Sequence, residues 1–143
     1  MSPRIAPDRR PPGGPGDGDA GRLQVMLHSD AGAPGRARVA LRGWSEKMLM
    51  EPFRRDALEL LVSELVTNAV RHAAGREAAP ISLAARCEAG EIVVTVTDGG
   101  IGALPRMRPP RGERGGYGLR IVDRESARWG VERDAGTRVW FAI

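Results

Sequence analysis

The chain has 143 residues, which is the size of one domain. Hydrophobic residues make up 41% of the chain and aromatic residues 4%, so the composition predicts one core built mainly from aliphatic side chains. No apolar run approaches the length of a membrane span, and no signal-peptide core is present, so we expect a cytoplasmic protein that does not enter a membrane. The single cysteine, Cys87, excludes an internal disulfide and is interpreted as a small buried hydrophobe.

The formal net charge is +4 and the isoelectric point is about 10.4, values that occur in nucleic-acid-binding proteins. The distribution of the basic residues argues against that function. Lys47 is the only lysine, and the arginines are spread along the whole chain without interleaved aromatic residues. Because a nucleic-acid site needs a clustered basic surface, we expect no direct contact with nucleic acid.

The N-terminal stretch differs from the rest of the chain in composition. Residues 1–21 are rich in proline and glycine, as in the run PPGGPG at residues 11–16. Such a stretch cannot bury enough apolar surface to order itself. The sequence therefore predicts a disordered tail, followed by one domain over residues 22–143.

The domain begins with a predicted strand and a predicted helix. Apolar and polar residues alternate from residue 23 to residue 28, which predicts the strand. Ser29 or Asp30 then offers a side-chain cap, and residues 36–50 have a helical pattern. The residues of this helix expected to face the core are Val39, Leu41, Trp44 and Met48.

The strongest periodic segment is LELLVSELVTNAVRHAA, at residues 58–74. Its apolar residues recur every three or four positions, which predicts an amphipathic helix with one buried face. Pro52 is well placed to open this helix, because proline is favoured in a first turn. Glu64, Asn68 and His72 follow one another at four-residue steps, so they line one side of the helix at the border of its apolar arc.

The second half of the chain is predicted to be mostly strand. Residues 88–91 form the connection of a hairpin, and residues 103–114 carry three prolines, which exclude a helix or a central strand and are typical of a lid. The other predicted elements are strands that begin at residue 81 and occupy 91–97, 127–133 and 137–143, and a short helix at 118–126.

This order of elements predicts an α+β fold. Strands that follow one another in runs, with helices between the runs, pack as a sheet with helices on one face. We therefore expect a two-layer sandwich with a mixed, mostly antiparallel sheet.

Three short motifs carry the groups expected to do chemistry. The first lies on the periodic helix, the second begins where the strand at 91–97 ends, and the third follows the lid. In order and spacing they resemble the N, G1 and G2 boxes of the GHKL ATPase superfamily, and the short chain resembles its anti-sigma-factor serine/threonine kinases. The residues that carry the resemblance are Glu64, Asn68 and His72, then Asp98, Gly100 and Gly102, then Gly116, Gly118 and Leu119.

The resemblance implies an ATP site. Asp98 would accept a hydrogen bond from the adenine amino group, and Thr137 would help to hold the base. Gly100 and Gly102 would let the backbone approach the base and the ribose, because glycine has no Cβ. The phosphates would be bound by the helix N-terminus at Gly116, Gly118 and Leu119, with Arg114 and His72 beside them.

The resemblance also assigns the metal and the catalytic base. Asn68 would supply a side-chain oxygen to Mg²⁺, a hard cation that takes its other ligands from phosphate and water. Glu64 would act as the general base when the γ-phosphoryl group of ATP is transferred. Arg38 resembles a family arginine that contacts protein partners.

The function that the resemblance implies is that of an anti-sigma factor that is also a protein kinase. Its partners would be a sigma factor and a STAS-type anti-anti-sigma protein, which it would phosphorylate, and it would form a homodimer. Two alternatives remain open: an ATP-binding regulatory module without phosphate transfer, and an isolated histidine-kinase-like catalytic domain. The second alternative needs a phosphoacceptor histidine on a dimerisation hairpin, and neither His28 nor His72 has such a setting.

Overall fold

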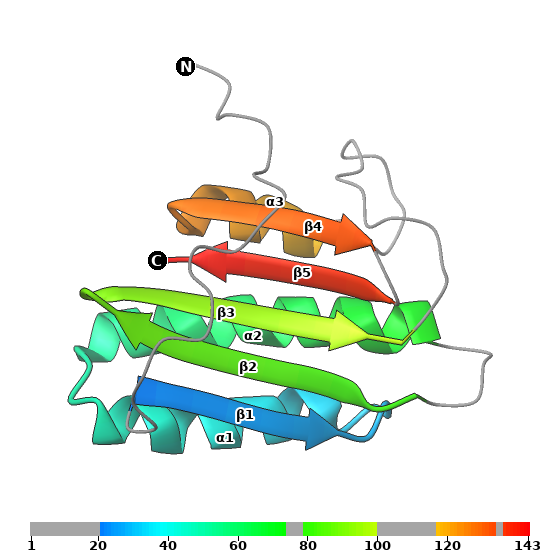
Figure 1. Ribbon diagram of the computed structural model, residues 1–143, viewed down its shortest axis with the longest axis horizontal. Coiled ribbons are helices and arrows are strands. Elements are labelled where there is room, and N and C mark those ends of the chain that lie inside the picture. The colour runs from blue at the N-terminus through cyan, green and yellow to red at the C-terminus, as the bar shows by residue number, and fades with distance from the viewer. Residues whose placement is uncertain (1–20, 74–78, 100–116, 134–135) are drawn as a thin grey trace.

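The computed structural model describes residues 21–73, 79–99, 117–133 and 136–143. Within these ranges the chain forms a five-stranded sheet in the order β1-β2-β3-β5-β4, and α1, α2 and α3 cover one of its faces (Figure 1). Every pairing between described strands is antiparallel, and the expected two-layer α+β fold is confirmed. The elements are β1 Arg22–Leu27, α1 Ala33–Lys47, α2 Pro52–Ala73, β2 Ile81–Glu88, β3 Glu91–Asp98, α3 Tyr117–Glu125, β4 Arg128–Arg133 and β5 Thr137–Ala142.

The main core lies between the helices and the sheet and is largely aliphatic, as the composition predicts. The buried face of α2 supplies one side, and alternate residues of β2, β3 and β5 supply the other. Among the described helices, none is long and apolar enough to cross a membrane. Fully or almost fully buried residues of this core include Leu41, Leu58, Leu61, Val62, Leu65, Ile81, Leu83, Val94 and Phe141.

Helix α1 begins earlier than predicted, and the prediction that Val39 faces the core is wrong. The helix starts at Ala33. Pro34 lies in its first turn, where the fixed φ of proline suits a helix. Val39 is 71% exposed. Leu41 and Trp44 are buried as expected, and at 100° per residue Val39 falls on the opposite side of the helix from them. Asp30 accepts from the N–H of Gly32 at 2.8 Å, before the helix, and no side chain caps its N-terminus.

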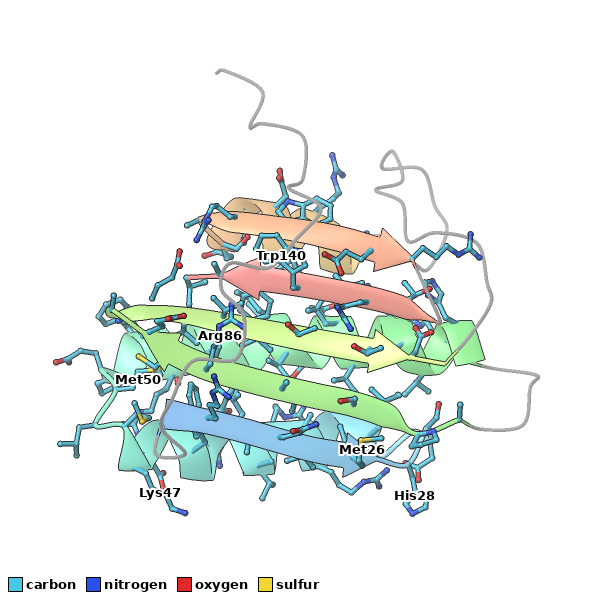
Figure 2. The ribbon with its side chains drawn as sticks, in the orientation of Figure 1. Met26, His28, Lys47, Met50, Arg86 and Trp140 are labelled. Atoms are coloured by element: carbon cyan, nitrogen blue, oxygen red, sulfur yellow. The ribbon has the colours of Figure 1, made fainter. Side chains whose placement is uncertain are left out.

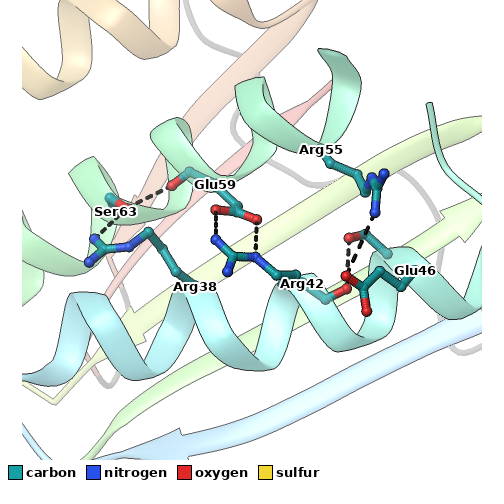
Figure 3. Close-up of polar contacts among 7 residues, drawn as sticks. Arg38, Arg42, Glu46, Arg55, Glu59 and Ser63 are labelled. Atoms are coloured by element: carbon teal, nitrogen blue, oxygen red, sulfur yellow. Dashed lines mark hydrogen bonds and ion pairs between the residues drawn. The ribbon is translucent and has the colours of Figure 1, made fainter. Parts of the chain in front are cut away.

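Polar side chains join α1 to α2 along their solvent side (Figure 3). Arg42 donates to both carboxylate oxygens of Glu59, at 3.0 and 2.9 Å, and this fork holds the pKa of Glu59 below its ordinary value. Arg38 donates to the hydroxyl of Ser63 at 3.0 Å. These contacts are exposed, and each contributes well under about 1 kcal/mol. They fix the rotation of α2 about its axis more than they stabilise the fold.

Two connections place residues in the left-handed region of φ. The hairpin between β2 and β3 turns through Ala89 and Gly90, which have φ angles of 49° and 80°. A two-residue turn of type I′ requires positive φ at both positions. The connection between α1 and α2 contains the second case, Leu49, with φ of 52°. Its N–H donates to the carbonyl of Glu46, and the N–H of Met50 donates to that of Ser45. These two bonds form a Schellman motif, in which the left-handed position is normally glycine.

Replacing Leu49 by glycine is expected to stabilise the protein by about 0.5–1 kcal/mol, because the side chain of Leu49 is sterically disfavoured at positive φ. Leu49 is 91% exposed, so its replacement removes little packing. Chemical denaturation of the two proteins measures the change. Leu49→Ala is the matched control, since it removes the exposed side chain but keeps a Cβ at positive φ. An equal gain for alanine and glycine would show that the effect comes from the side chain and not from the backbone.

Candidate functional site

The three polar residues predicted on α2 lie on one flank of that helix. Glu64, Asn68 and His72 are each half-buried, between the fully buried face of α2 and its solvent face. Helix α3 packs against α2. A carboxylate, an amide and an imidazole are therefore held at the edge of the core, where they are partly shielded from water and remain accessible.

The second part of the site is formed where β3 ends and β5 begins. Asp98 and Thr137 are partners in the antiparallel register of these strands, and they are 4% and 2% exposed. In Figure 1 the C-terminal ends of α2 and β3 lie at the same side of the molecule as the N-terminal ends of β5 and α3. Groups that are up to 73 positions apart along the chain (Glu64 to Thr137) are thus gathered at one end of the sandwich.

A direct measure of this juxtaposition is the distance between His72 and Asp98. Nδ1 of His72 lies 3.9 Å from Oδ2 of Asp98, so the last turn of α2 reaches the end of β3. This separation is too long for a hydrogen bond and becomes an ion pair only if the imidazole is protonated. A buried carboxylate beside an imidazole is suited to bind a planar ligand that donates hydrogen bonds.

Gly136 is a residue of this part of the molecule that the sequence analysis did not identify. A Cβ at this position would lie 2.1 Å from the carbonyl oxygen of Asp98 and 3.3 Å from Cα of Gly99. No side chain fits there, so only glycine lets the backbone before Thr137 approach the end of β3 so closely. The signal available in the sequence was a glycine directly before the predicted site threonine.

The remaining predicted residues divide into two groups. Leu119 is 1% exposed and belongs to the helix-side core, where it anchors α3, and Gly118 lies in the first turn of that helix. The lid at 103–114 and four predicted ligand-binding residues lie outside the described residues: Gly100, Gly102, Arg114 and Gly116.

The described residues offer few ligands to a metal ion. They contain no cluster of three or more His, Cys, Asp or Glu side chains that could hold a metal ion by themselves. Asn68 offers a neutral oxygen on the accessible flank of α2. This donor set fits Mg²⁺ bound mostly by phosphate oxygens and water, with one protein amide as an additional ligand.

The geometry thus combines an α+β sandwich, a buried acidic residue at a strand end and polar groups on the adjoining helix. A family model, the histidine kinase-like ATPase domain, matches residues 27–143. The chain belongs to this family. No curated protein matches the chain.

Two solved structures have the same fold. One is the structure of the RsbU and RsbW domains of Rv1364c from Mycobacterium tuberculosis, with a TM-score of 0.66 and 22% identity over 85% of this chain and 31% of that one. The chain thus spans about a third of the Rv1364c structure. The other is the SiaB-SiaC complex from Pseudomonas aeruginosa, with a TM-score of 0.63 and 13% identity over 85% of this chain and 88% of that one.

Replacing Gly136 by alanine is expected to destabilise the protein by about 1–3 kcal/mol, because the new methyl group would overlap the Asp98 carbonyl and force β3 and β5 apart. Thermal or chemical denaturation measures the loss. The matched control is Gly43→Ala in α1, where nothing lies within 4 Å of the added Cβ and alanine favours the helix. If Gly136→Ala were as stable as the wild type, the close approach at this position would not constrain the site.

Proposed function

We propose that this protein is an ATP-binding anti-sigma factor and a protein serine/threonine kinase, with a STAS-type anti-anti-sigma protein as its substrate. The observation that carries the proposal is the gathering of Glu64, Asn68 and His72 on α2 beside the buried pair Asp98 and Thr137. Membership of the histidine kinase-like ATPase family supports the use of ATP. The likeness in fold to a structure that contains an RsbW domain supports the choice among functions within that family.

In this proposal Asp98 selects the base. Its carboxylate only accepts hydrogen bonds when ionised, so it pairs with the amino group of adenine and is repelled by the carbonyl that guanine has at the equivalent position. Burial strengthens this discrimination, because water cannot replace the missing partner. Thr137, which is the neighbour of Asp98 in the sheet, adds a hydroxyl at the same edge of the base.

The flank of α2 is the proposed place of phosphate transfer. Asn68 would hold Mg²⁺, whose charge supplies electrostatic stabilisation to the phosphates when it is bound. Glu64 lies one helical turn before Asn68, so its carboxylate would take the proton of the acceptor hydroxyl as that oxygen attacks. His72, one turn after Asn68 and 3.9 Å from Asp98, lies between the base end and the phosphate end of the site.

The proposed protein partners are a sigma factor and the STAS-type protein, with a second copy of this chain completing a homodimer. One of the similar solved structures is a complex of two proteins, SiaB and SiaC, which supports a partner-binding role. Arg38 on α1 is the proposed partner-contacting arginine. It is exposed, and its donation to Ser63 on α2 ties that surface to the helix that carries the catalytic flank.

The first test of this function is the affinity for ATP of Asp98→Asn. The amide presents either a donor or an acceptor to the adenine amino group, so we expect binding to weaken by about 10- to 100-fold, corresponding to about 1.5–3 kcal/mol. Calorimetry with ATP and GTP measures the change. Equal affinity of mutant and wild type for ATP, with both proteins folded, would remove Asp98 from the base-binding role.

The second test concerns the metal. ATP binding by the wild type is expected to tighten when Mg²⁺ is added, and Asn68→Ala is expected to lose most of that gain while its binding in EDTA is unchanged. Titrations with ATP in EDTA and in Mg²⁺ measure the affinity without and with the metal. Thr67→Ala, on the same helix turn, is the matched control. Wild-type titrations that coincide in the two buffers would exclude Asn68 as a ligand.

The third test separates a kinase from a binding module. Glu64→Ala is expected to lower the rate of phosphate transfer by about two to four orders of magnitude and to leave the affinity for ATP close to that of the wild type. The carboxylate acts only as the acceptor oxygen loses its proton, so its loss affects turnover and spares ground-state binding. Radiolabelled ATP with the STAS-type protein provides the assay. If the wild type binds ATP and that protein without transferring phosphate, the regulatory module replaces the kinase.

A further inference from the structure

The solvent side of α2 carries an apolar stripe formed by Phe53, Ala57 and Leu60. Phe53 and Leu60 are 71% and 43% exposed, and the half-buried Ala57 lies between them in the sequence. Steps of four and three residues place the three side chains on one side of the helix. A surface helix normally keeps its apolar residues on the core side and polar residues on the solvent side. Because the core side of α2 is already apolar, the apolar stripe is a second surface that is available to a partner.

The apolar stripe leads to Glu64, the proposed general base. Glu64 follows Leu60 by four residues and Phe53 by eleven, so it lies about 20° from Phe53 around the helix axis and roughly 17 Å from it along that axis. The polar contacts of α1 with α2 involve Glu59 and Ser63, which lie outside the stripe (Figure 3). The stripe and the proposed base therefore form one continuous line along α2.

We propose that the apolar stripe is the docking surface for the protein that carries the phosphoacceptor hydroxyl, a proposal that rests on the kinase function proposed above. In the transfer, the hydroxyl oxygen forms a bond to the γ-phosphorus of ATP, the bond to ADP breaks, and the proton passes to Glu64. A general base has to lie within hydrogen-bond distance of the proton that it takes. The body of the acceptor protein therefore lies against α2 next to Glu64, where the stripe begins.

The stripe also defines the chemistry of the surface that it binds. The side chains of Phe53, Ala57 and Leu60 offer neither a charge nor a hydrogen bond. The complementary surface is therefore an apolar patch beside the acceptor serine or threonine of the STAS-type protein. Large side chains that lose all their water on binding contribute most to affinity. Phe53 is the largest and most exposed residue of the stripe, so we expect it to be the main anchor.

A second copy of this chain is the other candidate occupant of the stripe. Leu60 lies one helical turn from Glu64, or roughly 6 Å along the helix axis. A second copy seated on the stripe would therefore obstruct the approach of an acceptor hydroxyl to Glu64. A homodimer that transfers phosphate has to use another surface, so the position of the stripe favours the acceptor protein as its occupant.

Steady-state kinetics with the double variant Phe53→Ala, Leu60→Ala test the proposal. The probe is the purified STAS-type protein, encoded in the same genome as this chain, that the wild type binds. The KM for this protein is expected to rise by about 10- to 100-fold, while kcat and the affinity for ATP stay within about twofold of the wild type. Docking contacts are the same in the ground state and the transition state, so their loss raises KM without lowering turnover. Both substituted side chains are exposed, so we expect the fold to be retained.

Met26→Ala is the matched control. Met26 is 59% exposed, and its side chain points away from those of Val25 and Leu27, which pack in the main core, because residues alternate across a strand. It therefore lies on the face of the sheet away from α2, the face that Figure 2 views. Its replacement also removes exposed apolar surface and is expected to leave the KM unchanged. An equal rise in KM for this variant would overturn the proposal, because any loss of apolar surface would then have the same effect.

The other outcomes separate the docking surface from the kinase function. If the wild type transfers phosphate and the double variant keeps the wild-type KM, the docking surface is wrong and the kinase stands. If the wild type binds the STAS-type protein without transferring phosphate, the kinase is wrong and calorimetry replaces the kinetics. An unchanged Kd for the double variant then overturns the docking surface, and a Kd raised by the same factor supports it. If no STAS-type protein binds the wild type, both proposals fail.

Photo-crosslinking identifies the occupant of the stripe directly. A benzoylphenylalanine in place of Phe53 is expected to crosslink to the STAS-type protein when the two proteins are mixed with Mg²⁺ and ATP. The same group in place of Met26 is expected to give no such crosslink. Crosslinks from position 53 to a second copy of this chain, in place of the STAS-type protein, would overturn the proposal.

Discussion

The approach of Gly136 to the carbonyl of Asp98 is the constraint on which the pairing of Asp98 with Thr137 depends. A Cβ at position 136 would lie 2.1 Å from that oxygen, so the backbone before β5 passes closer to the end of β3 than any side chain allows. This contact fixes Thr137 as the partner of Asp98, and both side chains are buried. A shift of one residue between β3 and β5 would turn Thr137 to the other face and separate the pair.

The position of Glu64, Asn68 and His72 depends in turn on the rotation of α2 about its axis. Buried leucines and valines set one side of the helix in the core, and α3 packs against the helix. On another side, Arg42 and Arg38 of α1 hold Glu59 and Ser63 (Figure 3). Burial on one side and polar contacts on another leave α2 little freedom to rotate, so the side chains at four-residue steps keep a fixed direction.

Much of this arrangement could be predicted from the sequence, and the parts that could not be predicted have two different causes. Strand alternation and helix periodicity are local, so they located most elements and the polar line on α2. Val39 was misplaced because β-branched residues also occur on solvent faces, and one apolar side chain does not define the buried arc of a helix. Gly136 was missed because its role comes from strand pairing, which brings residues distant in sequence together.

The two faces of the sheet differ in what packs against them. On the helix side, aliphatic side chains interlock with α1, α2 and α3, and every layer is built from regular structure whose backbone groups are already paired. On the other side, Val93, Trp140 and Ala142 form a small separate cluster, and no described helix packs on it. The described helices are therefore confined to one face of the sheet, and the core between the two layers is what holds α2 and its polar side chains in place.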